Sequence, residues 1–89
     1  MEDKIILTDN GKIVLAYMQK NDEILVGKDI GDKIGIKGIY PVLTSLVNKG
    51  LVRKEEPVQR EFTNAKGESK LKDYKTYQLT DKGRIYQIY

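Results

Sequence analysis

The spacing of the apolar residues changes at Gly50, and this change most strongly restricts which elements the chain can form. Before Gly50, apolar residues recur at helical spacing at positions 39, 42, 43, 46 and 47, and Lys49-Gly50 ends the pattern. After Gly50, the runs LVRKEEPVQREF and KLKDYKTYQLT contain β-branched and aromatic residues and flank the polar stretch TNAKGES. Because a period of 3.6 is typical of helices and a period of 2 of strands, the sequence predicts helices followed by a long β-hairpin. The sequence therefore predicts an α+β fold.

Two earlier segments complete the predicted framework. Residues 8–20 predict a helix, with Thr8 or Asp9 as the N-cap and one apolar stripe made of Ile13, Val14, Tyr17 and Met18. The apolar run at residues 24–26 predicts a brief strand before the next helix.

A second short helix is predicted directly before the helix at 38–49. Ile30 and Ile34 lie at helical spacing, and Gly35 fits a left-handed helix end. Two short helices joined by a glycine-containing turn form a helix-turn-helix. Pro41 lies in the first turn of the helix at 38–49, where the amide that it lacks would have no intrahelical partner, so it is compatible with that helix.

The hairpin and the C-terminal stretch have their own predictions. Tyr77 and Leu79 share one face of the second strand, whereas Tyr74, Thr76 and Gln78 take the other. Pro57 has no amide to donate to a ladder, so it belongs at an edge or a bulge. In TDKGRIYQIY, Thr80 or Asp81 is a candidate cap for a helix of about two turns, at ~3.6 residues a turn, with Ile85, Ile88 and Tyr89 at helical spacing.

Composition narrows the class of protein. The 89 residues suffice for one domain, residues 1–89, with a small core. The absence of histidine and cysteine removes the usual acid/base group, thiolate nucleophiles and the commonest metal ligands, so we expect no enzyme, no metal and no cofactor. We expect a cytoplasmic location and no membrane contact, because no long apolar run occurs and acidic residues stand where a signal peptide has basic ones.

The basic residues are concentrated in the second part of the chain. The net charge is +3, but residues 1–50 hold seven lysines against seven acids, and residues 51–89 hold nine basic residues against six acids. We expect the C-terminal part to face any negatively charged partner.

The order helix, strand, helix, turn, helix and hairpin resembles the winged-helix domain of bacterial transcription regulators. The stretch IYPVLTSLVNKGLV is similar to the recognition helix of PadR-type regulators, and YKTYQLTDKGR resembles the return strand of the wing and the following helix start in PadR-type and MarR-type proteins. The resemblance covers residues 24–84. It implies a winged helix-turn-helix with three helices, a short strand, a two-stranded wing and a short C-terminal helix.

The resemblance implies a sequence-specific double-stranded DNA-binding regulator of transcription, with the helix at 38–49 in the major groove and the wing at 51–79 on the backbone. The DNA-binding candidates are exposed residues of that helix and basic residues nearby and in the wing, namely Lys28, Lys37, Tyr40, Pro41, Thr44, Ser45, Asn48, Arg60, Lys66, Lys70 and Lys72. The alternative for the helix is a solvated polar face, and for the wing, lysines that keep an exposed edge from pairing with other chains.

The alternative function is a winged-helix module that binds another protein of the transcription or replication machinery, which the mild charge and the acidic neighbours Glu61, Glu68 and Asp73 keep open. A homodimer is expected because winged-helix regulators usually bind two half-sites. Ile85, Ile88 and Tyr89 are candidates for its interface; folding back onto the first helix is the alternative, favoured for Ile85, and a dimer contact is favoured for Ile88 and Tyr89.

Overall fold

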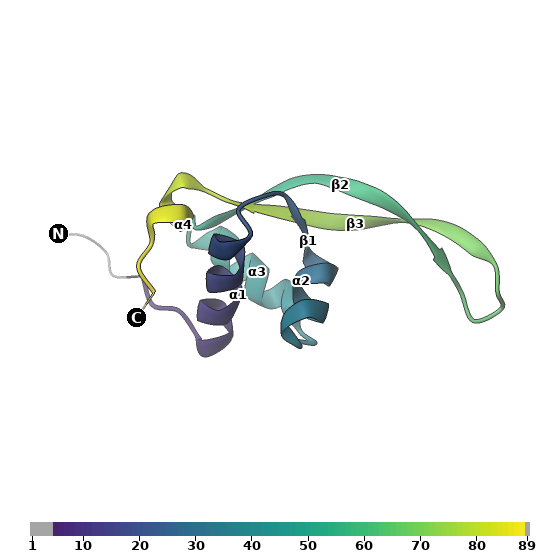
Figure 1. Cartoon of the computed structure of the whole chain (residues 1–89), viewed down its shortest axis with the longest axis horizontal. Coiled ribbons are helices and arrows are strands. Elements are labelled where there is room, and N and C mark those ends of the chain that lie inside the picture. Colours follow the sequence, from purple (N-terminus) through teal and green to yellow (C-terminus); the bar gives the residue numbers. More distant parts are fainter. Residues whose placement is uncertain (1–4, 89) are drawn as a thin grey trace.

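The computed structural model describes residues 5–88 and is a mixed α+β fold (Figure 1). In these residues four helices and three strands follow one another as α1 (Asp9–Lys20), β1 (Leu25–Val26), α2 (Gly27–Ile34), α3 (Ile39–Asn48), β2 (Val52–Thr63), β3 (Ser69–Leu79) and α4 (Asp81–Ile85). The predicted order of helices, short strand and hairpin is confirmed. No helix within the described range is long and apolar enough to cross a membrane.

The sheet joins the helical body to a long projecting hairpin. Its three strands are antiparallel in the order β1-β3-β2, and the short β1 pairs only with Tyr77 and Thr76 of β3. β2 and β3 remain paired from Val52↔Leu79 out to Thr63↔Ser69. The outer hairpin therefore extends past α2 without further covering strands, and the longest dimension of the molecule is 56 Å (Figure 1).

The core lies between the helices and the base of the hairpin. Leu15, Ile30 and Leu43 are 0% exposed, one from each of the first three helices, and the sheet adds Tyr77 and Leu79. Full burial of such a side chain stabilises the fold by about 1.5–3 kcal/mol. The helices are thus fixed to the root of the hairpin, which sets the position of α3 relative to β3.

The predicted start of α1 is confirmed, but one residue of its apolar stripe is not. Thr8 is the N-cap, and its hydroxyl accepts a hydrogen bond of 3.0 Å from the amide of Gly11. Ile13 is 48% exposed, whereas Leu15 is fully buried. The prediction for Ile13 is wrong because α3 and α2 contact the side of α1 that carries Val14, Leu15 and Met18, and Ile13 lies at the margin of that side.

The turn between α2 and α3 has the predicted construction. Gly35 ends α2 at φ +73°, a left-handed conformation that glycine adopts without a steric penalty. α3 follows after residues 35–38, and Pro41 lies in its first turn as predicted. A Cβ on Gly31 would lie 2.9 Å from the carbonyl oxygen of Ile36, so glycine allows α2 and the turn to pack closely.

Pro57 lies at a bulge, as predicted. The strand register shifts between Glu55 and Val58, and there the Thr76 hydroxyl donates a hydrogen bond of 2.7 Å to the carbonyl of Glu56. This bond explains why Thr76 is buried as well as its neighbour Tyr77. A bulge increases the twist of the strands, and the hairpin beyond this point consequently turns a different face toward the helices.

The C-terminal prediction needs a correction. Thr80 is the N-cap of α4, as expected, but the helix ends at Ile85 and the backbone is extended at Tyr86. Ile85 is 80% exposed, so the prediction that it folds back is wrong; the change of direction places Tyr86 and Ile88 against the core instead. Ile88 is therefore half-buried within the chain, and Tyr89 lies outside the described residues.

Candidate nucleic-acid interface

The outer face of α3 presents polar side chains to solvent. Tyr40, Pro41, Thr44 and Asn48 are exposed, and Lys37 is exposed in the turn before the helix. Ser45 is half-buried and its hydroxyl lies 2.7 Å from the Lys49 ammonium, which donates to it. Thr44 and Asn48 therefore keep their hydrogen-bonding groups on the surface, while Ser45 already holds a partner on its own helix.

The outer hairpin separates its charges between two faces. Residues directly opposite in an antiparallel pair share a face, and successive residues of a strand alternate between faces. The register Val58↔Tyr74, Arg60↔Lys72 and Phe62↔Lys70 defines one face, called here the basic face. The intervening pairs Gln59↔Asp73, Glu61↔Leu71 and Thr63↔Ser69 define the opposite face.

This separation of the charges gives the two faces of the hairpin different electrostatic potentials. Arg60, Lys70 and Lys72 all lie on the basic face, whereas Glu61 and Asp73 lie on the opposite face. In the linear sequence these acids seem to neutralise the lysines beside them, but the pleat places the two signs on opposite sides. The basic face is thus a strip of positive charge with aromatic side chains, Phe62 and Tyr74, between the cations.

Near its root, the basic face is turned toward α2. Two nitrogens of the Arg60 guanidinium donate to the two carboxylate oxygens of Asp29, at 2.9 and 2.8 Å. The hydrogen bond from Arg60 is the main reason that the pKa of Asp29 is below its ordinary value of 3.8, and the charges of Arg60 and Lys28 lower it further. Both side chains are about half exposed, so the pair orients the hairpin more than it stabilises the fold.

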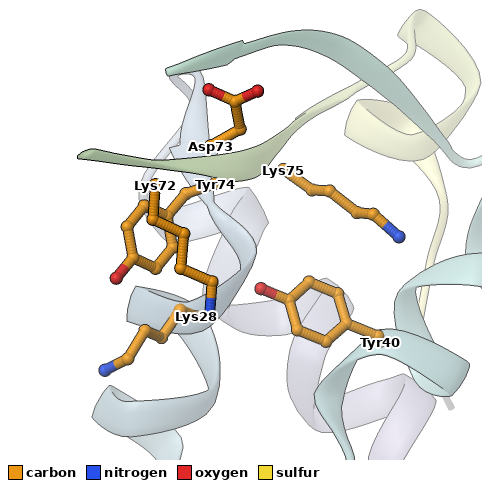
Figure 2. A pocket seen from close by; sticks show the side chains of 6 residues that line it. All are labelled: Lys28, Tyr40, Lys72, Asp73, Tyr74 and Lys75. Atoms are coloured by element: carbon orange, nitrogen blue, oxygen red, sulfur yellow. The ribbon is translucent and has the colours of Figure 1, made fainter. Parts of the chain in front are cut away.

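A pocket of about 400 Å³ lies where this face meets the starts of α2 and α3. Its lining comes from Lys28 of α2, Tyr40 of α3 and residues 72–75 of β3 (Figure 2). The Lys72 ammonium is 5.6 Å from the centre of the Tyr74 ring, and the Lys75 ammonium is 5.5 Å from that of Tyr40. The cation–π contact between Lys75 and Tyr40 connects the hairpin to the first turn of α3.

The tip of the hairpin is a compact turn. The side-chain oxygen of Asn64 accepts hydrogen bonds from the amides of Lys66 and Glu68, and Gly67 takes φ +81°. Lys66 is exposed there. The chain turns within the predicted stretch 63–69, but Thr63 and Ser69 still pair as strand residues, and the turn between them is held by its own hydrogen bonds.

The structure brings four of the predicted candidates together and adds two residues, Asp29 and Tyr74, that the sequence did not indicate as a site. Lys28, Tyr40, Arg60 and Lys72 are neighbours around the pocket and the Asp29 contact, whereas Lys66 and Lys70 lie farther out on the hairpin and Asn48 at the far end of α3. Lys75, one of the basic residues that the sequence places in the hairpin, also lines the pocket. Tyr74 directly precedes Lys75 in β3, which is a detectable signal, whereas the Asp29 contact depends on the twist of the hairpin.

Other kinds of site find little support in the described part of the chain. No group of three or more carboxylates is arranged there to hold a metal ion. A second pocket, of about 380 Å³, has Glu23, Asp29 and Asp32 on its wall, but Arg60 and Lys28 already pair with the two aspartates. The basic face and the α3 surface offer cations, hydroxyls and amides, which are groups that can bind anionic and polar ligands.

Comparison with known proteins gives no family for this chain. A scan of the sequence against protein-family models found no match, and a search among curated proteins found no similar protein.

Proposed function

We propose that this protein is a winged-helix DNA-binding regulator of transcription, in which α3 enters the major groove and the hairpin, as the wing, follows the phosphate backbone. The observation that carries the proposal is the basic face: Arg60, Lys70 and Lys72 lie together, whereas the nearby acids Glu61 and Asp73 lie on the opposite side. A strip of cations on one side of a projecting hairpin suits a phosphate backbone, which bears one charge per ~1.7 Å of duplex axis.

The placement of α3 supports the same proposal. Its exposed residues Thr44 and Asn48 carry a hydroxyl and an amide, which are suited to base edges in the major groove. Tyr40 lies at the start of the same helix and touches the hairpin through Lys75. One continuous surface therefore offers base-reading groups on α3 and backbone-binding cations on the hairpin, the division of labour that duplex recognition requires.

The test is binding of a fluorescent random-sequence duplex, followed by anisotropy at two salt concentrations. We expect measurable affinity at low salt that falls steeply as salt rises, because phosphate contacts release counterions. Selection of targets from a random DNA pool should then enrich one sequence, and Asn48→Ala should reduce its preference over random duplex more than its affinity for random duplex. Undetectable binding at low salt would reject this proposal and favour the protein-binding alternative.

A further inference from the structure

The pocket between α2, α3 and β3 concentrates positive charge at its centre. Lys28, Lys72 and Lys75 line it, together with a single acid, Asp73. The Asp73 carboxylate points to the other side of the strand from Lys28 and Tyr40 (Figure 2). The ion pairs found among residues 5–88 do not include Lys72 or Lys75. The pocket thus holds two ammonium groups that form no ion pair within the described residues.

Aromatic rings hold these ammonium groups in place. Lys72 lies over Tyr74 and Lys75 over Tyr40, at 5.6 and 5.5 Å from the ring centres. The Tyr40 hydroxyl points toward the end of the Lys72 side chain (Figure 2), where a hydroxyl can donate a hydrogen bond to an anion. The lining therefore supplies both positive charge and a neutral hydrogen-bond donor, and two of its lysines lie over its aromatic rings.

The N-termini of α2 and α3 also favour an anion in the pocket. Lys28 and Tyr40 lie in the first turns of α2 and α3, and the caps of these helices, Val26 and Gly38, make no side-chain hydrogen bond to the first amides. Helix N-termini carry partial positive charge and favour anions. Asp32 offsets part of the charge of Lys28, with which it pairs at 2.7 Å, so Lys72 is the central cation of the pocket.

We propose that this pocket binds a phosphate group, held by the Lys72 ammonium and the Tyr40 hydroxyl, with Lys75 and Lys28 at its border. The volume of about 400 Å³ admits a phosphate with part of the molecule that carries it. The phosphate belongs either to a nucleic-acid backbone or to a free phosphate-bearing small molecule. The chemistry of the pocket is the same for both, and the proposal stands independently of whether duplex DNA is the partner.

The test uses pyrophosphate as the probe and nuclear magnetic resonance of the full chain as the readout, with sodium chloride at matched ionic strength as the reference. We expect amide shifts concentrated at residues 28, 40 and 72–75. Lys72→Ala should weaken pyrophosphate binding at least about tenfold, the effect of losing one charge-assisted hydrogen bond. Lys70→Ala is the matched control: it removes the same charge from the same face of β3 but lies outside the pocket, and it should change the affinity by less than about twofold.

Tyr40→Phe keeps the ring under Lys75 and removes only the hydroxyl, so it should weaken pyrophosphate binding about threefold to tenfold without altering the fold. Equal losses for Lys72→Ala and Lys70→Ala, or shifts spread over all lysines, would overturn the pocket proposal. So would the absence of pocket shifts at millimolar pyrophosphate.

A second arm identifies the source of the phosphate. If pyrophosphate displaces a bound duplex and Lys72→Ala weakens both ligands, the pocket takes a backbone phosphate. If a nucleoside triphosphate occupies the pocket while duplex affinity is unchanged, it takes a free phosphate-bearing molecule. Pyrophosphate binding at the pocket without any duplex binding would reject the proposed DNA function and keep the pocket; duplex binding without pyrophosphate binding would do the reverse.

Discussion

Moving two positive charges from one face of the hairpin to the other should abolish their contribution to DNA binding without changing the net charge. Lys70 and Lys72 lie on the basic face, whereas Gln59 and Thr63 are exposed on the opposite face. A variant with Lys70→Ala and Lys72→Ala loses two charges. Adding Gln59→Lys and Thr63→Lys restores the net charge of +3 but places both charges on the wrong side.

The expected size follows from counterion release. Each phosphate that a lysine neutralises adds about 0.9 to the slope of log affinity against log salt. Loss of two such contacts lowers the slope by about 1.8, so a fourfold rise in salt should weaken the variant about twelvefold less than it weakens the natural protein. All four positions are exposed, so we expect changes in unfolding free energy within about 0.5 kcal/mol for each.

The assay is anisotropy of a random-sequence duplex at about 50 and 200 mM salt, a range over which the slope is readily measured. We expect the double variant and the relocated variant to share the reduced slope. If the relocated variant recovered the natural affinity and slope, net charge alone would govern binding, and the argument from the two faces would be refuted.

Three further predictions concern the fold and its assembly. Arg60→Gln should raise the pKa of Asp29 toward 3.8, and the chemical shift of the Asp29 carboxyl carbon measures this pKa. Because the pKa is lowered in the natural protein, the contact is complete above pH 3.8 and is lost as the pH falls through the lowered value. Identical acid titrations of the two proteins would contradict this prediction. In thermal unfolding, Gly83→Ala should destabilise the fold by about 1–3 kcal/mol, because the new Cβ would collide with the carbonyl of Leu51. The control Gly38→Ala, whose Cβ would have no atom within 4 Å, should change the free energy of unfolding by less than about 0.5 kcal/mol. Similar losses for both variants would show that close packing at Gly83 is unimportant. We expect a dimer in light scattering that Ile85→Ser converts to a monomer with little change in unfolding free energy, since Ile85 is 80% exposed, and a monomeric natural protein would remove Ile85 from any such interface.

The sequence predicted the elements well where a local rule decides the outcome. The left-handed Gly35 and the first-turn Pro41 each depend on a few neighbouring residues and were predicted, and Thr8 and Thr80 were each one of two predicted cap candidates. The early end of α4 was not, because the burial of Tyr86 and Ile88 against distant residues overrides the helical spacing of Ile85 and Ile88.

The candidate site was predictable in its parts but not in its arrangement. Lysines in the hairpin and polar residues on α3 are visible in the sequence, as is the alternation that separates Lys72 from Asp73 once the strand register is known. The register itself depends on the bulge at Pro57, and the contact between Arg60 and Asp29 depends on the twist that follows it. These are long-range outcomes, and they decide which residues surround the pocket.

The bulge at Pro57 and the contact between Arg60 and Asp29 together determine the direction of the outer part of the hairpin. Between Val58 and the tip at Asn64 the strand spans about 20 Å at ~3.4 Å per residue, so a rotation of about 10° at the bulge displaces the tip by about 3.5 Å. The ion pair of Arg60 with Asp29 lies close to the bulge, so a small movement at this ion pair corresponds to a large displacement of the hairpin tip. Loss of the Asp29 contact would therefore leave the outer part of the hairpin free to turn about the bulge, with the largest displacement at its tip.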